Sequence, residues 1–265
     1  MRGVRYVAWR LALGVVTILV IVVLNFALLH LAPGDAADVL AGEAGAATPE
    51  YMVQLRQKFG LDQPTYVQLA VYLKRVATLD LGYSFRHGMA VTDLILGRLG
   101  PTLLLMLTVF AISVGSGIAL GAVAARNVNR WSDHMLSMLA IVAYATPVFW
   151  AGLMAIVVFS IKFGWFPTSG IEQIGAFNEG WTRIGDIAHH LVLPALTLSL
   201  FYIALYTRLM RASVLDQYAM DYVTTARAKG LTERQIARRH VLRNAVLPVL
   251  TMAGVQFGGL LGGAV

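Results

Sequence analysis

The sequence contains no cysteine and little charge: 13% of its 265 residues are charged, whereas 58% are apolar. The absence of cysteine excludes a disulfide scaffold, a thiolate metal site, a cysteine nucleophile and a lipidated cysteine anchor. No GxxxxGK[ST] run occurs, so the chain has no P-loop of its own. Soluble domains average about 45–50% apolar and about 25% charged residues. The composition therefore indicates an integral membrane protein.

Long apolar runs supply the length of about 20 residues that a membrane-spanning helix needs. We expect an all-α, polytopic transmembrane helix bundle with five spans. The last run ends at Val265 without a polar flank or a basic anchor, so we expect the sequence to be truncated at its C-terminus. The expected spans cover residues 11–31, 101–125, 134–161, 191–210 and 245–265.

Basic residues in the short connections orient these spans, because they concentrate on the cytoplasmic side. The N-terminus carries Arg2, Arg5 and Arg10 and no acid, and segment 207–244 holds eight basic residues against three acids. Connection 162–190 holds two basic residues against three acids. We therefore expect a multi-pass protein with a cytoplasmic N-terminus.

The inner segment after the fourth span contains two short predicted helices. Asp221 can cap the first, and Gly230 ends it in the usual manner of a C-terminal glycine. Thr232 and Gln235 fit a capping box that opens the second. One interpretation is a basic juxtamembrane anchor that only fixes the topology. The other is a rigid protrusion for a cytosolic partner, in which the small side chain of Ala226 allows close approach.

The outer segment between the first two spans also contains two predicted helices. Thr48 fits an N-cap with Pro49 in the first turn, and Gly60 ends that helix. The second helix starts at Pro64 and ends near Thr78. Both are amphipathic and either lie over the mouth of the bundle or form a docking surface for a delivered ligand or partner.

Small residues and proline mark positions of close packing or bending. Glycines four residues apart let helix backbones approach closely, either within this chain or against a second chain. Pro147 lacks a backbone donor and is expected to kink the third span. The spaced glycines are Gly117 and Gly121 in the second span, and Gly254, Gly258 and Gly262 in the fifth.

The inner segment resembles a known family. DYVTTARAKGL at 221–231, followed by RRHVLRNAVLP at 238–248, is similar to the cytoplasmic signature loop of permease subunits in bacterial ATP-binding-cassette (ABC) importers. More narrowly, it resembles the B-type subunit of dipeptide and oligopeptide importers, a group that also contains nickel and glutathione permeases. Further landmarks follow in the family's order: LAPGD at 31–35, LDLGYSF at 79–85, RLGPTL at 98–103, TPVFWAGL at 146–153, GWFPTSG at 164–170 and HLVLPALTLSL at 190–200.

The resemblance implies one half of a type I importer in the bacterial inner membrane. In such importers two permease chains form the pathway, two cytosolic ATPase subunits dock beneath it, and an external solute-binding protein delivers the cargo. It implies an N-terminal span with an external loop region at 1–97 and the importer core domain at 98–265, with its coupling loop at 207–247 and a sixth span missing. ATP and Mg²⁺ belong to the partner ATPases, so the chain is expected to have no cofactor, metal, catalytic site or nucleic-acid partner.

The resemblance also implies roles for individual residues and a cargo. A coupling helix would enter a cleft of the ATPase, with Leu231 packed behind it, although Thr224 stands where these permeases usually have arginine. The cargo would be a short peptide; the alternatives are nickel, glutathione or another small solute, or a truncated remnant without function. The implied partner-binding residues are Asp221, Thr225, Ala226, Lys229, Gly230 and Leu231.

Other classes of protein fit the sequence less well. No span centre clearly carries an acidic or basic residue, although Arg208 lies near the inner end of the fourth span, which disfavours a proton-coupled transporter or a voltage-gated channel. Ser116 lies in mid-span and the histidines lie near span ends, which disfavours an intramembrane serine protease. His189 and His190 are neighbours that point in different directions on a helix, which makes them weak nickel ligands.

Overall fold

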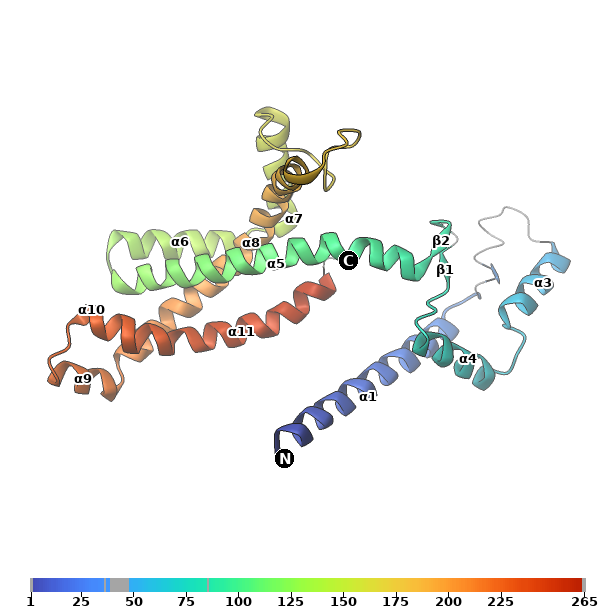
Figure 1. Cartoon of the computed structure of the whole chain (residues 1–265), viewed down its shortest axis with the longest axis horizontal. Coiled ribbons are helices and arrows are strands. Elements are labelled where there is room, and N and C mark those ends of the chain that lie inside the picture. The colour runs from blue at the N-terminus through green and yellow to red at the C-terminus, as the bar shows by residue number, and fades with distance from the viewer. Residues whose placement is uncertain (1, 36, 39–47, 85, 264–265) are drawn as a thin grey trace. The chain divides into compact units, whose positions relative to one another are not determined.

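The computed structural model describes residues 2–35, 37–38, 48–84 and 86–263 of the chain. The chain separates into two compact units, Met1–Gly97 and Arg98–Val265. Figure 1 shows that both units are built from helices. Val265, where the truncation is expected, lies outside the described residues.

The first unit combines three described helices with a short hairpin. Strand β1 (Tyr83–Ser84) pairs antiparallel with β2 (Met89–Ala90), so that Tyr83 lies opposite Ala90. The next helix begins at Val91, directly after the hairpin, and the Val91 N–H donates to the Gly82 carbonyl at 3.0 Å. The helices are α1 (Arg2–Leu31), α3 (Pro49–Phe59) and α4 (Thr65–Ala77).

Helix α4 packs against the C-terminal end of α1. Phe26 is 9% exposed, and its ring lies 5.7 Å from that of Tyr72 on α4. The Asn25 amide donates to the Tyr72 hydroxyl at 3.4 Å, and a ring nitrogen of His30 lies 3.1 Å from the Gln68 carbonyl oxygen. These polar residues interrupt an otherwise apolar span because they form the contact between the two helices.

The predicted caps of α3 are confirmed. The Thr48 hydroxyl accepts from the Tyr51 N–H, and Gly60 has a φ of 66° at the C-terminal end. Arg56 on this helix donates to Asp35 at 2.7 Å. Partial burial opposes ionisation of Asp35, but hydrogen bonds from the Asp38 N–H and from Arg56 outweigh it and hold the pKa of Asp35 below its ordinary value.

The second unit contains the remaining helices, two of which are π-helices. The α-helix α5 begins seven residues before the boundary of the unit. The elements are α5 (Val91–Arg126), α6 (Trp131–Ala145), α7 (Val148–Ala155), the π-helix η1 (Ile156–Lys162), α8 (Gly180–Tyr218), α9 (Asp221–Ala228), α10 (Glu233–Ile236), the π-helix η2 (Ala237–Val241) and α11 (Leu242–Gly263).

The all-α transmembrane fold class is confirmed. Four described helices are long and apolar enough to cross a membrane, and one bent pair raises the number of spans to five. The continuous span expected at 134–161 is instead this pair, since α6 ends at Ala145 and α7 begins at Val148, with 99° between their directions. Pro147 sits at the break in an extended conformation (ψ 127°), where its ring has no N–H to continue the ladder of α6.

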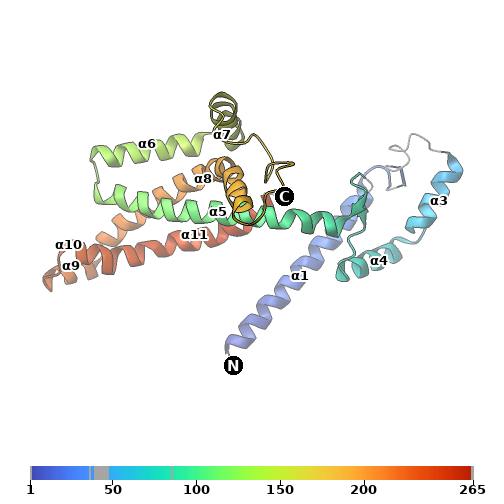
Figure 2. The ribbon, with the colours of Figure 1, turned by 45° about the horizontal axis from the view of Figure 1, so that its top comes forward.

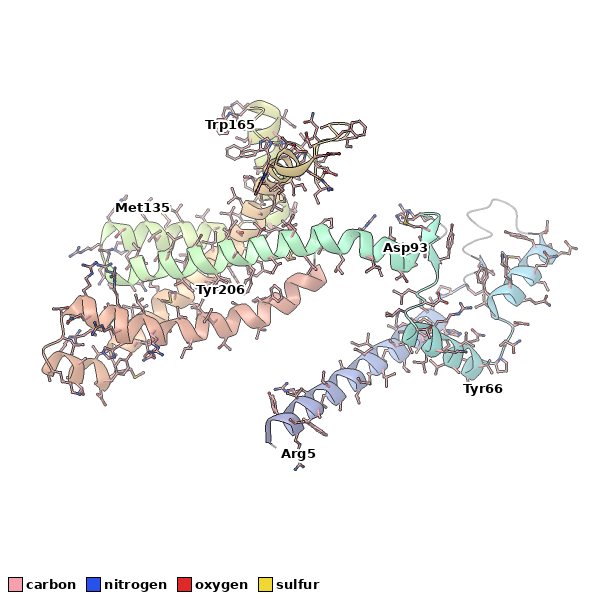
Figure 3. The ribbon with its side chains drawn as sticks, in the orientation of Figure 1. Arg5, Tyr66, Asp93, Met135, Trp165 and Tyr206 are labelled. Carbon is pink, nitrogen blue, oxygen red and sulfur yellow. The ribbon has the colours of Figure 1, made fainter. Side chains whose placement is uncertain are left out.

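Helix α8 crosses the other long helices of its unit obliquely, as the two views of the ribbon show (Figure 2). It packs against α6, α7 and α11. Its backbone also comes very close to α5 at the spaced glycines. A Cβ at Gly121 would lie 2.6 Å from the Met210 Cβ and 2.6 Å from the Thr207 carbonyl oxygen, and a Cβ at Gly117 would collide with Tyr206, which Figure 3 labels. Gly117 and Gly121 therefore pack within this chain.

This close approach gives the first prediction. Gly121→Ala would force α5 and α8 apart and lower the stability of the chain by about 1–3 kcal/mol, as overpacking does elsewhere. Gly115→Ala is the matched control, because a Cβ there meets no atom within 4 Å and the residue lies in the same helix. Thermal unfolding of the two variants in detergent measures the difference. Equal midpoints for both variants would contradict the packing.

Candidate functional site

The predicted coupling segment forms a short, well-defined helix, α9. Its N-cap is Met220, which makes no side-chain capping bond, and Asp221 occupies the first turn. The prediction that Asp221 caps the helix is therefore wrong by one residue. In the first turn its carboxylate instead faces the positive end of the helix dipole.

The turn after α9 has the geometry of a Schellman motif. The Gly230 N–H donates to the Arg227 carbonyl at 2.9 Å, and the Leu231 N–H donates to the Ala226 carbonyl at 3.2 Å. Gly230 has a φ of +80°, a conformation that glycine adopts without strain. The prediction that Gly230 ends the helix is confirmed.

The second short helix is fixed by two further contacts. The capping box is confirmed: the Thr232 hydroxyl accepts from the Gln235 N–H, and the Gln235 side chain accepts from the Thr232 N–H at 2.9 Å. Across the turn, Arg227 pairs with Glu233 at 2.7 Å. Both side chains of this pair are about half exposed, so the pair orients the two helices and adds little stability.

One side of α9 is buried in the core of its own unit. Val223 is fully buried and Ala226 is 6% exposed, and Leu231 packs against the same cluster. The expected position of Leu231 behind the helix is therefore observed. Ala226 faces inward, one helical turn from Val223, so it supports the helix and does not offer a surface to a partner. The buried members of the cluster are Ala125, Tyr206, Met210, Val214, Val223, Ala226, Ile236, Val241, Ala245, Val249 and Ala253.

The other side of α9 is open. Asp221, Thr225, Lys229 and Gly230 are all exposed, and so is Thr224. A Cβ built on Gly230 would meet no atom within 4 Å. The structure thus brings four of the six predicted partner-binding residues to one exposed end of the unit. This end combines the short side chains of Thr224 and Thr225 with the charge of Lys229 and a tight turn at Gly230.

Sequence analysis missed an ion pair that supports this site. Arg211 on α8 forms a bidentate ion pair with Asp133 on α6. Its Nε donates to Oδ1 at 2.7 Å and its Nη2 donates to Oδ2 at 2.8 Å. The Asn129 N–H adds a bond at 3.1 Å, and Asp133 is 2% exposed. The partners are 78 residues apart in the sequence, so no local pattern indicates their pairing.

The glycines of the fifth span lie in a different environment from those of the second. A Cβ at Gly254 or Gly258 would meet no atom within 4 Å among the described neighbours. Gly262 lies in α11, near its C-terminal end. Gly254 and Gly258 therefore do not pack against the described part of this chain.

The paired histidines hold the loop that precedes α8. Nε2 of His189 lies 2.7 Å from the Trp165 carbonyl, and Nδ1 of His190 lies 2.9 Å from the Asp186 carbonyl. Within the described ranges, no group of three His, Asp or Glu residues is placed to hold a metal ion. The contacts of both histidines are thus with the loop and with their own helix.

Two family models together match most of the chain. The model described as the inner membrane component of binding-protein-dependent transport systems matches residues 117–265. The model of the N-terminal part of such membrane components matches residues 3–106. The first match includes the whole segment from α9 to α11.

Curated relatives align over nearly the full chain. A protein of Brucella abortus named as a peptide transport system permease is 38% identical over 256 residues, which cover 97% of this chain and 79% of the relative. A protein of Brucella ovis named as a peptide permease is 39% identical over 262 residues, which cover 98% of this chain and 81% of the relative. The glutathione transport system permease protein GsiC of Escherichia coli is 40% identical over 98% of this chain and 80% of the relative.

The Asp133–Arg211 pair gives the second prediction. Asp133→Asn leaves the partly buried guanidinium of Arg211 without its charge partner and should lower the thermal midpoint by several degrees. The double variant Asp133→Asn with Arg211→Gln should lose less than the sum of the single variants, because the two groups act together. Arg183→Gln is the control, since its pair with Glu172 is exposed on both sides and its loss should not be measurable. Equal midpoints for Asp133→Asn and Arg183→Gln would contradict the pairing.

Proposed function

The chain belongs to the family of inner membrane components of binding-protein-dependent transport systems, and on that basis we propose that it forms half of an import pathway for short peptides. It is a multi-pass membrane permease subunit of an ABC importer. Transport, with energy supplied from outside the chain, is the function that its helices and its lack of a P-loop support.

The proposed cargo rests on the names of the relatives. Those at 38–40% identity are named as permeases for peptides or for glutathione. Glutathione is itself a tripeptide, so both names describe a small, flexible solute with a carboxylate and an amide backbone. A short peptide is the cargo class that accounts for both.

The observation that carries the proposed mechanism is the two-sided environment of α9. Its exposed side, with Thr225, Lys229 and Gly230, is proposed to dock in a cleft of a cytosolic ATPase subunit. Its buried side shares one apolar cluster with α8 and α11. When ATP draws the ATPase subunits together, the displacement of α9 is transmitted to both long helices, which changes the side of the membrane to which the pathway is open.

Two further surfaces are proposed for the other partners. The open glycine face of α11, at Gly254 and Gly258, suits close packing with a second permease chain. The helices α3 and α4 follow the first span on the side away from the N-terminus. With the N-terminus in the cytoplasm, they face the solute-binding protein that delivers the cargo.

The third prediction tests the docking of α9. Gly230→Ala places a side chain at φ +80°, which costs about 1–2 kcal/mol of local strain, and adds a methyl group where the ATPase is proposed to approach. Gly175→Ala is a matched control, because Gly175 has a φ of +81° and is equally open. We expect the Gly230 variant to lose ATP-driven peptide uptake and co-purification with the ATPase.

The control should retain both properties, because the backbone strain is the same and only the proposed contact differs. Gly230→Leu and Gly175→Leu extend the comparison to a larger side chain. Equal uptake and equal recovery of the ATPase in the Gly230 and Gly175 variants would show that α9 does not form the coupling interface.

The fourth prediction tests the orientation. The chain has no cysteine, so a single introduced cysteine reports its own side of the membrane. Ile174→Cys, at a residue 98% exposed, should react with an impermeant thiol reagent added to intact cells whose outer membrane is permeable to it. Arg238→Cys, in the exposed part of η2, should react only after the inner membrane is opened. The reverse pattern would place the N-terminus outside.

A further inference from the structure

Two arginines three residues apart on α8 have very different surroundings. Arg211 is held by Asp133 through two short bonds. Arg208 is exposed, and its guanidinium carbon lies 5.9 Å from the centre of the Tyr144 ring. Among the described residues, no carboxylate lies within ion-pair distance of Arg208. Of these two arginines, Arg211 is therefore neutralised within its unit, whereas Arg208 has no such partner among the described residues.

The unpaired guanidinium lies deep along the helices. The short connection between α5 and α6 marks one face of the membrane, and α6 begins there at Trp131. Tyr144 follows 13 residues later, about 20 Å along the helix at a rise of about 1.5 Å per residue. The hydrocarbon core is about 30 Å thick. The contact with Tyr144, whose side chain itself leans back toward Trp131, places the charge of Arg208 inside the membrane-spanning segment, deeper than the position of residue 208 near the inner end of the span indicates.

The side chain of Arg208 also points away from the nearer membrane face. Long side chains on a helix lean toward its N-terminus, and the N-terminus of α8 lies at the opposite face. A lipid-exposed arginine would normally extend to the nearer headgroups. Arg211 reaches the nearer face and meets Asp133 at the start of α6, whereas Arg208 reaches Tyr144 at the other end of that helix. This direction disfavours a lipid phosphate as its partner.

The surroundings of Arg208 resemble a binding site more than a packing contact. The Tyr144 ring stacks on Phe201 of α8 at 4.9 Å, so the guanidinium lies beside a pair of aromatic rings. A ring supports the flat face of a guanidinium and leaves the N–H groups at its edge free to donate. Tyr206 and Met210 are buried against α5, about 200° around α8 from Arg208, which therefore faces away from that core.

We propose that Arg208 lines the translocation pathway and binds a carboxylate of the cargo during its passage. The inference rests on the proposed function, because it requires a water-filled pathway and a cargo that bears a carboxylate. Intramembrane cations face a water-filled cavity or an anionic partner, and a guanidinium binds a carboxylate through two parallel bonds. With one exposed cation the contact is weak enough for the cargo to leave.

The location is tested with a single cysteine beside Arg208. Tyr144→Cys is made in the otherwise cysteine-free chain, and the assembled complex is treated with an anionic or a cationic water-soluble methanethiosulfonate. Modification is followed by the mass of this chain. At about 6 Å in water-like surroundings, one charge changes the local concentration of a univalent ion about threefold. The ratio of anionic to cationic rates should therefore fall about tenfold when Arg208→Gln is added.

Arg130→Gln is the control, because it removes an exposed positive charge from the connection before α6 and should leave the ratio unchanged. Failure of both reagents to react would place this face in lipid and overturn the proposal. A ratio that Arg208→Gln does not change would also overturn it, since the guanidinium would then lie too far from the water-filled space beside residue 144 for its charge to act there. Neither rate depends on transport, so both remain measurable if the proposed function fails.

The ligand is tested by uptake in vesicles that contain the complex and ATP. A labelled dipeptide is the first cargo and glutathione the second. Arg208→Gln should lower the uptake per ATP hydrolysed by about tenfold, because a bond to a charged group is lost, and Arg208→Lys should retain most of it. Uptake by Arg208→Gln equal to that of the unchanged chain would overturn the carboxylate assignment. Absence of uptake in the unchanged chain would instead count against the peptide cargo.

Discussion

The apolar cluster between α9, α8 and α11 is the contact on which the mechanism depends. Val223 of α9 and Ile236 of α10 are fully buried in it, beside Met210 of α8 and Val249 of α11. Each buried apolar side chain of this size contributes about 1.5–3 kcal/mol. Close-packed clusters transmit displacement because they deform little. A helix of eight residues can therefore move two long ones, and the Schellman turn and the capping box keep its exposed end in a fixed shape.

Much of this arrangement follows from the sequence, because its causes are local. Apolar runs indicate the spans, and Gly230 and the pair Thr232 and Gln235 indicate the turn. Helix ends were less predictable: α8 covers 39 residues, although its apolar run is about half as long, since its polar ends continue as helix beyond the run. The bend at Pro147 was predicted from its missing N–H, although its size of 99° was not. The pairing of Asp133 with Arg211 was not predictable, because it depends on how α6 packs against α8.

Some charged residues of the second unit form ion pairs between its helices, whereas Arg208 does not. Asp133 and Arg211 join α6 to α8 shortly before α9, and Arg227 and Glu233 join α9 to α10. Both pairs fix the relative orientation of helices through which a displacement of α9 would be transmitted. Arg208 has no such partner among the residues described, and its aromatic support leaves its donors free. The same helix thus combines a structural cation with one available to a passing solute.

The most direct test of the account is a cross-link from α9 to an ATPase subunit. The chain carrying Thr225→Cys is expressed with a second permease and ATPase subunits of the same organism, and the membranes are treated with a short thiol-to-amine cross-linker. The account predicts an adduct between this chain and the ATPase that depends on the introduced cysteine, and no such adduct for Ile174→Cys. Recovery of the assembled complex without an adduct at Thr225→Cys, or with an equal one at Ile174→Cys, would contradict it.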